Sequence, residues 1–584
     1  MDTIQQHSYK QSIFFSLMSG ILTAICFPPC SFSSLSWFCL IPWFYTLHRQ
    51  SFRQMLLSHF FFQACFWGIG IYWMSSVHPI CPVAILLPMY FICLPFPVLF
   101  WWAIKEKKFC VFFVPPVLWV GQEYLRSFLF SGFPYLFMGH SQAMNPNIIQ
   151  IADLTGVYGV SYAIVVVNAL LCFYLESFLG SKKQRSRIIA YTAFGFIVIS
   201  SIFLYGNHKI KSLLYDRGPK IASIQGNIPQ DIKDDPHLNR QKILEAYTEL
   251  TVQALKEKVD LLVWPETMSP EDVQLDPHIY SMFQDIARKT ETSLLIGSHF
   301  YDMDFKKKDS KTYNSAYFIN TKGEIVERYD KIRLVIVGEY VPLRNTFPVI
   351  PAIIKNIAGF IPDLQEGTRR PLFSLKDKRF GCLICYDIAY SEDARILRKQ
   401  GADFLINITN EGWFFDTAEL EQLLGISIFR AVENRMGILR STNSGISLMI
   451  PPTGIITKED TLTLPIEQYV HALPDYLRKR IVGKSTLAWH HLPQAIWQGG
   501  FLTTGEKNWD ILWDGQKLKW KDFPGFFSRQ VPLATKEISF YTHYGDIFAL
   551  CMSCICLVFS LMMLSQFLTF FHQKKLAKEC RDLG

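Results

Sequence analysis

Long apolar runs at both ends of the chain constrain its fold more than any other feature. Residues 547–571 form one such run without a charged side chain, and similar runs fill roughly the first 205 residues. A run of about 18 or more apolar residues is long enough to cross a bilayer as a helix. Charged residues make up only 18% of the chain, and this deficit lies at the two ends. We therefore predict a membrane protein whose middle part is a soluble domain.

The apolar runs predict seven spans before the soluble domain and one after it. Two of the runs are short, and prolines such as Pro28 and Pro115 blur their limits. The expected spans are residues 13–29, 35–47, 55–77, 83–104, 109–120, 157–175, 188–205 and 547–571.

Basic residues between the runs predict the orientation. They cluster before the first span, in the second, fourth and sixth loops and after the last span, whereas the third loop, residues 77–82, has none. Lys and Arg concentrate on the cytoplasmic side of membrane proteins. Both termini are therefore expected in the cytoplasm, with the soluble domain on the opposite side. The net charge of +8 belongs to these clusters and does not indicate a nucleic-acid partner.

The expected domains follow from these limits. Residues 1–206 form a seven-span domain, 207–546 an extracytoplasmic domain with an insertion at about 461–525, 547–571 a last span and 572–584 a basic cytoplasmic tail. A cleaved signal peptide is the alternative for the first run, but no small-x-small cleavage site follows it. The loop of residues 121–156 is either an interfacial loop with aromatic anchors or a wall of a lipid-accessible cleft, and Glu123 and Arg126 within it lie one helical turn apart.

The soluble domain alternates short apolar strands with helical stretches. Strands are expected at 221–225, 260–264, 293–297, 313–319, 379–384, 404–408, 438–441 and 446–451, and helices at 237–258, 280–290, 393–400 and 419–435. This alternation predicts an α/β domain with a largely buried sheet.

Three segments of this domain carry residues suited to acyl transfer. Glu266 follows a buried strand directly, Lys331 stands in the segment Tyr-Asp-Lys-Ile-Arg-Leu, and Cys385 ends the strand Gly-Cys-Leu-Ile-Cys. Cys382 and Cys385 should face opposite sides of their strand, which argues against a redox pair. A carboxylate can take the thiol proton, the thiolate can attack an ester, and an ammonium group can stabilise the oxyanion.

With their flanks, these segments resemble the Glu, Lys and Cys motifs of the nitrilase superfamily, and with the membrane spans the chain resembles the apolipoprotein N-acyltransferases. The resemblance covers residues 12–571 except 461–525. It includes the segments at 225–230 (QGNIPQ), 338–342 (GEYVP), 410–414 (NEGWF), 429–433 (FRAVE), 440–445 (RSTNSG), 132–134 (GFP) and 139–142 (GHSQ).

The resemblance implies a multi-span α-helical membrane domain joined to a nitrilase-like α-β-β-α sandwich, and a ping-pong reaction without metal or cofactor. Cys385 would take an acyl chain from a phospholipid as a thioester and pass it to the N-terminal diacylglyceryl-cysteine of an apolipoprotein, the last step of lipoprotein maturation. Glu266 would be the general base and Lys331 the oxyanion stabiliser. The implied supporting residues are Glu339, Tyr386, Asp387, Asn410 and Trp413.

The same resemblance implies a monomer in a bacterial inner membrane, with its catalytic domain in the periplasm and membrane lipids around it. Three positions depart from the family pattern: Asp387 stands where Glu is usual, Arg333 where His is frequent, and Gln422-Leu423 where Gln-His is frequent. Two rival interpretations are a membrane-anchored nitrilase-type amidase, which would use the same triad, and a transporter, which few intramembrane charges support.

Overall fold

A computed structural model describes residues 7–582 except 48, 107–111, 180–184, 229, 231–235, 305–308, 342–343, 345–348, 359–361, 415–416, 458–509, 514–515 and 520–524. Its internal contacts divide the chain into two units. The first comprises residues 1–72, 80–208 and 546–584, and the second comprises 73–79 and 209–545. The predicted insertion at 461–525 lies almost entirely outside the described residues.

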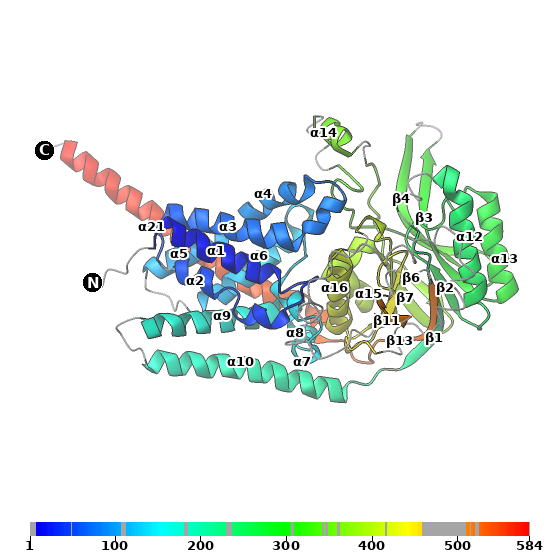
Figure 1. The fold of residues 1–584 in the computed structure, drawn as a ribbon, viewed down its shortest axis with the longest axis horizontal. Coiled ribbons are helices and arrows are strands. Elements are labelled where there is room, and N and C mark those ends of the chain that lie inside the picture. Colours follow the sequence, from blue (N-terminus) through cyan, green and yellow to red (C-terminus); the bar gives the residue numbers. More distant parts are fainter. Residues whose placement is uncertain are drawn as a thin grey trace. The chain divides into compact units, whose positions relative to one another are not determined.

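The first unit is helical (Figure 1). Among the described residues, four helices are long and apolar enough to cross a membrane, namely Cys81–Lys105, Val157–Phe178, Ser186–Ser212 and Ile547–Lys574. Its elements are α1 (Tyr9–Ala24), η1 (Ser33–Trp37), α2 (Ile41–Leu47), α3 (Phe52–Gly70), α4 (Cys81–Cys93), α5 (Pro95–Glu106), α6 (Val114–Phe128), η3 (Leu129–Ser131), η4 (Met138–Gln142), α7 (Pro146–Ile149), α8 (Ala152–Thr155), α9 (Val157–Leu179), α10 (Arg185–Ser212) and α21 (Ile547–Asp582). The short turn η2 (Tyr72–Ser76) follows α3, and all of it after Tyr72 groups with the second unit.

Two of the predicted spans differ most from the helices found. The run at 35–47 divides into the short turn η1 and the seven-residue α2, so it is no continuous spanning helix. The run at 55–77 ends as a helix at Gly70, and η2 follows. Residues 73–79 then group with the second unit. Among them only Trp73 is buried, and hydropathy does not show in which part of the protein it is buried.

The loop expected over residues 121–156 begins within α6, and most of residues 132–143 after it are buried. Glu123 accepts hydrogen bonds from the Trp119 Nε1–H (2.9 Å) and the Met138 N–H (2.6 Å). Arg126 donates to the Leu136 carbonyl (3.3 Å) and stacks on the ring of Phe137. Both charged residues thus hold the irregular segment against α6, where its polar backbone groups find partners inside the protein.

The second unit contains two stacked sheets. The first has the order β13-β1-β2-β3-β4-β5 and the second β10-β9-β8-β7-β6; a separate hairpin joins β11 and β12. β1 pairs in parallel with β2 and β2 with β3, as β7 does with β8 and β8 with β9. The strands are β1 (Arg217–Gln225), β2 (Leu261–Trp264), β3 (Ser293–Asp304), β4 (Asp309–Ile319), β5 (Ile325–Asp330), β6 (Leu372–Leu375), β7 (Lys378–Ile384), β8 (Phe404–Thr409), β9 (Gly437–Thr442), β10 (Leu448–Ile450), β11 (Asp510–Trp513), β12 (Gln516–Lys519) and β13 (Gly525–Pro532).

Helices cover the outer faces of both sheets (Figure 1). α12 and α13 lie on the first sheet, and α15 and α16 on the second. The helical elements are α12 (Pro236–Ala254), α13 (Pro277–Thr290), α14 (Val349–Ala358), η5 (Cys385–Ala389), α15 (Ser391–Lys399), η6 (Gly412–Phe414), α16 (Glu419–Asn434) and α20 (Phe540–Tyr544). The layers are therefore α-β-β-α.

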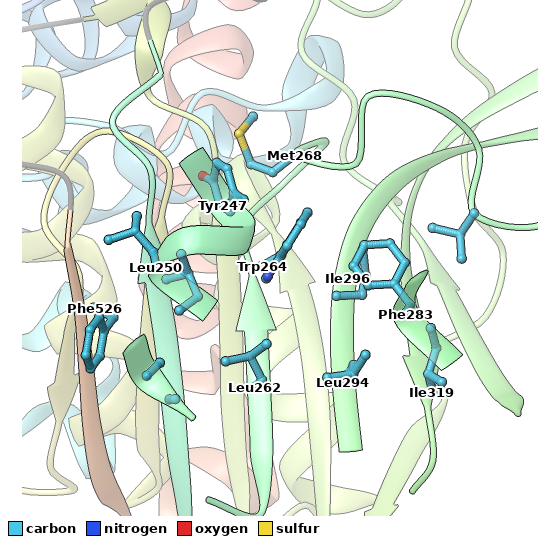
Figure 2. Close-up of a cluster of buried hydrophobic side chains, with 14 of the residues drawn as sticks. Tyr247, Leu250, Leu262, Trp264, Met268, Phe283, Leu294, Ile296, Ile319 and Phe526 are labelled. Atoms are coloured by element: carbon cyan, nitrogen blue, oxygen red, sulfur yellow. The ribbon is translucent and has the colours of Figure 1, made fainter. Parts of the chain in front are cut away.

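Alternation along the strands builds two separate cores. Leu262 and Trp264 of β2 face α12 and α13, where Figure 2 shows them among Tyr247, Phe283 and other apolar side chains. Leu261 and Val263 point the other way, into a core shared by both sheets. Because strand side chains alternate between faces, one four-residue apolar strand supplies both cores.

Candidate active site

Cys385 lies where β7 ends and the chain turns into η5. Its φ is 49°, in the left-handed region that a residue with a side chain rarely adopts. Its carbonyl accepts a hydrogen bond from Asn407 Nδ2 at 3.4 Å, and the same amide donates to the Leu383 carbonyl at 3.2 Å. Such strained turns persist only where their surroundings fix them, and they concentrate at functional sites.

Asp387 fixes this turn from behind. It is fully buried, and its Oδ2 accepts the Ile384 N–H (2.9 Å) and the Tyr329 hydroxyl (2.8 Å), while Oδ1 accepts the Arg333 N–H (2.7 Å). Burial and the neighbouring charge of Asp393 raise the pKa of Asp387 to about 7. The residue ties β7 and the segment after β5 together, which places the residues that follow these two strands side by side.

Glu266 comes two residues after β2 and is 5% exposed. Its Oε2 accepts the backbone N–H of Asn410 at 2.7 Å. Its Oε1 accepts Asn314 Nδ2 at 2.7 Å and lies 3.4 Å from Lys331 Nζ. A carboxylate held by three donors is fixed in position.

Lys331 follows β5 and is 1% exposed. Its ammonium group lies 2.8 Å from Glu339 Oε1, and Glu339 Oε2 accepts the Val335 N–H at 2.8 Å. Burial by itself lowers the pKa of Lys331, but the charges of Glu339 and Glu266 raise it, and the net effect is a pKa well above its usual value. The site therefore holds a permanent cation between two carboxylates.

The thiol of Cys385 experiences both signs of charge. Burial raises its pKa most strongly, and the charge of Glu266 raises it further, whereas the Lys331 ammonium and the Thr409 hydroxyl lower it; the net pKa is well above the usual value. The charges of Glu266 and Lys331 thus both act on the Cys385 thiol. The resting group is a protonated thiol, which must lose its proton to a base before it can attack.

The remaining predicted residues surround this centre. Asn410 contributes its backbone N–H to Glu266, and its side-chain oxygen accepts Asn443 Nδ2 at 2.9 Å. Tyr386 packs edge-on against Tyr390 with ring centroids 5.2 Å apart. Trp413 stands on η6 and is 42% exposed, so it is the open member of the set.

Asn314 is a site residue that the sequence analysis missed. It is 3% exposed on β4, and its Nδ2 donates to Glu266 (2.7 Å) and to Glu339 Oε1 (3.2 Å). A neutral amide between two carboxylates separates like charges that would otherwise repel. A polar residue inside an apolar strand was the available signal, but strands alternate polar and apolar residues so often that this signal alone did not select it.

Arg440 is a second missed residue, and its signal was stronger because it interrupts the apolar strand β9. It is 0% exposed and pairs with Glu411, the residue that follows Asn410. It also donates to Asn407 Oδ1 at 3.5 Å, across registered strands. One buried guanidinium thus contacts both the segment bonded to Glu266 and the amide bonded to the Cys385 carbonyl.

Two family models match different parts of this chain. Residues 19–170 match the family described as apolipoprotein N-acyltransferase N-terminal domain, and residues 220–464 match carbon-nitrogen hydrolase. The apolipoprotein N-acyltransferase of Geobacter metallireducens is 30% identical over 466 residues, which cover 78% of this chain and 87% of the relative. The one from Pasteurella multocida is 28% identical over 463 residues, 76% of this chain and 86% of the relative.

Among solved structures, a mutant of the amidase from Nesterenkonia sp. AN1 matches with 20% identity and a TM-score of 0.30, covering 41% of this chain and 87% of the amidase. The carbon-nitrogen hydrolase match and the α-β-β-α layers confirm the predicted fold class, a multi-span membrane domain with a nitrilase-like sandwich. The likeness to the Geobacter enzyme over most of both sequences shows that this chain belongs to the apolipoprotein N-acyltransferase family and is a membrane acyltransferase.

Proposed function

We propose that this protein moves an acyl chain from a phospholipid to the α-amino group of an N-terminal diacylglyceryl-cysteine of a lipoprotein, through a thioester on Cys385. The observation that carries the proposal is the buried Lys331 ammonium between Glu266 and Glu339, with both its charge and that of Glu266 acting on the Cys385 thiol. Membership of the family supports N-acylation of lipoproteins as the reaction.

In the first half-reaction, Glu266 takes the thiol proton and the thiolate attacks an ester carbonyl of the phospholipid. The tetrahedral oxyanion lies close to the Lys331 ammonium, whose charge stabilises it. The ester C–O bond then breaks, the leaving alkoxide takes the proton back from Glu266, and a lysophospholipid departs. Because the pKa of Cys385 is raised, this proton transfer to Glu266 is required and the thiol is not spontaneously ionised.

In the second half-reaction, the lipoprotein amine attacks the thioester carbonyl. Glu266 takes a proton from the amine, the C–S bond breaks, and the thiolate recovers the proton. The products are an amide and the free thiol, so no net proton is consumed. Glu339 keeps the lysine charged and in place throughout, because it holds the ammonium at 2.8 Å.

We also propose where the protein lies in the cell and how many copies of the chain form the working enzyme. The protein lies in a bacterial inner membrane. The positive-inside pattern supports termini in the cytoplasm and the second unit, with its candidate active site, in the periplasm. The described residues of one chain supply Glu266, Lys331 and Cys385 together, which supports a monomer as the working unit.

Intact mass spectrometry of the purified full-length protein tests the proposal. Wild type incubated with phospholipid should gain one acyl chain that hydroxylamine removes, and a diacylated lipopeptide should discharge it. Cys385→Ala should gain nothing. Cys382→Ala is the matched control, since Cys382 is a buried thiol three residues away in the core between the sheets, and it should behave as wild type.

The opposite result identifies the rival. No adduct with any phospholipid, together with a hydroxylamine-labile adduct from a small amide, would reject the acyltransferase mechanism in favour of a membrane-anchored amidase. A phospholipid adduct on Cys385→Ala would reject Cys385 as the nucleophile.

A further inference from the structure

Trp73 belongs to the second unit, which carries the candidate active site and is called the catalytic unit below, although it follows α3 of the first unit. It lies on η2, between α3 and α4, and residues 73–79 group with residues 209–545. A tryptophan beside an apolar helix ordinarily marks the membrane interface, with its indole N–H toward water or headgroups. Trp73 is instead 3% exposed and packs inside the catalytic unit.

Two contacts hold the indole in this unit. Its Nε1–H donates to Gln422 Oε1 at 3.0 Å, and Gln422 lies in the first turn of α16 with 5% exposure. Its ring meets Phe414 edge to face, with centroids 5.0 Å apart and planes at 83°. A buried tryptophan with a partner for its N–H and a perpendicular aromatic neighbour is fixed in both position and rotation.

Phe414 ends the short turn that begins directly after Asn410. The Phe414 N–H donates to the Glu411 carbonyl at 2.9 Å, which closes this turn. At its near end, the Asn410 N–H donates to Glu266 at 2.7 Å. The turn therefore has one end bonded to the proposed general base and the other end packed against Trp73, and the exposed Trp413 lies between them.

We infer that Trp73 is a positioning residue for the acyl-transfer reaction. By fixing Phe414 against α16, it holds the 410–414 turn so that the Asn410 N–H orients the Glu266 carboxylate and Trp413 stays at the open side of the site. The inference rests on the proposed function, since it assumes that Glu266 activates the Cys385 thiol. It adds a residue from the connection between α3 and α4 to the machinery of the soluble domain.

The test is a double-mutant cycle on the full-length protein in detergent. Trp73→Phe removes the indole N–H but keeps an aromatic ring, and Gln422→Leu removes the acceptor. The first-order rate of acyl-enzyme formation is measured by intact mass over a range of phospholipid concentrations. Each single variant should slow acyl-enzyme formation at saturating phospholipid about five- to tenfold, which corresponds to the loss of one buried hydrogen bond. The phospholipid concentration that gives half the maximal rate should change little.

The double variant should be no slower than either single variant, because both remove the same bond. Trp67→Phe is the matched control: this indole is also buried, donates to Gln63 at 2.7 Å, and lies in α3 of the other unit. It should form the acyl-enzyme at the wild-type rate, while thermal unfolding verifies that every variant is folded.

A Trp73→Phe rate within twofold of wild type, or single effects that multiply in the double variant, would overturn the inference. If wild type forms no acyl-enzyme at all, the proposed function has failed instead. The cycle is then repeated on turnover of a small amide, which uses the same base and tests Trp73 by the same criteria.

Discussion

Lys331→Met removes the ammonium group that lies 2.8 Å from Glu339 and 3.4 Å from Glu266. Methionine has nearly the length of lysine and fills the same buried space without charge. The two carboxylates then remain close together, bridged by the Asn314 amide. Both stability and catalysis should change, and they should change for different reasons.

The contact distances set the scale of the stability loss. At an effective dielectric constant of about 20, the lysine attracts the two carboxylates by about 6 and about 5 kcal/mol before desolvation is subtracted. Breaking a buried ion pair by removing one partner costs about 3–5 kcal/mol net, and this is the destabilisation expected. Loss of an oxyanion-stabilising donor should separately slow acyl-enzyme formation about 100- to 1,000-fold.

The double variant Lys331→Met/Glu339→Gln separates the two effects. It removes one carboxylate together with the lysine, so thermal unfolding in detergent should show most of the stability restored. The rate of thioester formation, followed by intact mass, should stay as low as in the single variant. Acyl-enzyme formation by Lys331→Met within tenfold of wild type would refute the role of the lysine, and full activity in the double variant would refute the separation.

Three further outcomes follow from the buried charges. The folded pKa of Asp387 is raised from 3.8 to about 7, so the folded protein keeps a proton that the unfolded chain releases, and this group lowers stability as pH rises between these values. Asp387→Asn should therefore flatten that part of the profile of unfolding temperature against pH. An unchanged slope would contradict the assignment. Since the Glu266 charge raises the pKa of Cys385, Glu266→Gln should let iodoacetamide alkylate the thiol at lower pH. The same variant should lose acyl-enzyme formation. A shift of alkylation to higher pH would contradict this effect of Glu266 on the thiol. Glu411→Gln leaves Arg440 buried without its counter-charge and should cost about 3–5 kcal/mol of stability, measured by thermal unfolding. The double variant Glu411→Leu/Arg440→Met should recover most of this loss. A loss below about 1 kcal/mol in the single variant would show that the pair is not structurally important.

Local pattern was enough for most of the sandwich. The strand ending at Trp264 and the helix at 419–435 were placed within one or two residues, because a short apolar run before Pro265 and a long apolar period leave few alternatives. β5, β6 and β13 were missed. β13 pairs antiparallel with β1, which lies some 300 residues earlier, and such a partner cannot be deduced from local pattern.

The limits of hydropathy appear in the membrane part. The run at 55–77 is predominantly apolar, yet its last residues leave α3 and group with the second unit, where Trp73 is bonded. An apolar composition indicates that burying these residues is favourable, but it does not indicate where in the protein they are buried. Glu123 and Arg126 show the same limit, because both side chains bond to the backbone of the segment that follows α6.

The sequence by itself determined that this protein has spanning helices, an α/β soluble domain, a thiol and a carboxylate each placed at the end of a strand, and a lysine between them in the chain. Those features depend on runs and alternation, which are properties of neighbouring residues. Only the tertiary structure decided that Asn314 separates two carboxylates, that Arg440 supports both sides of the site, and that Trp73 fixes the turn beside Glu266. Each of these contacts joins residues far apart in the chain, and their energy exists only when folding has removed water from between them.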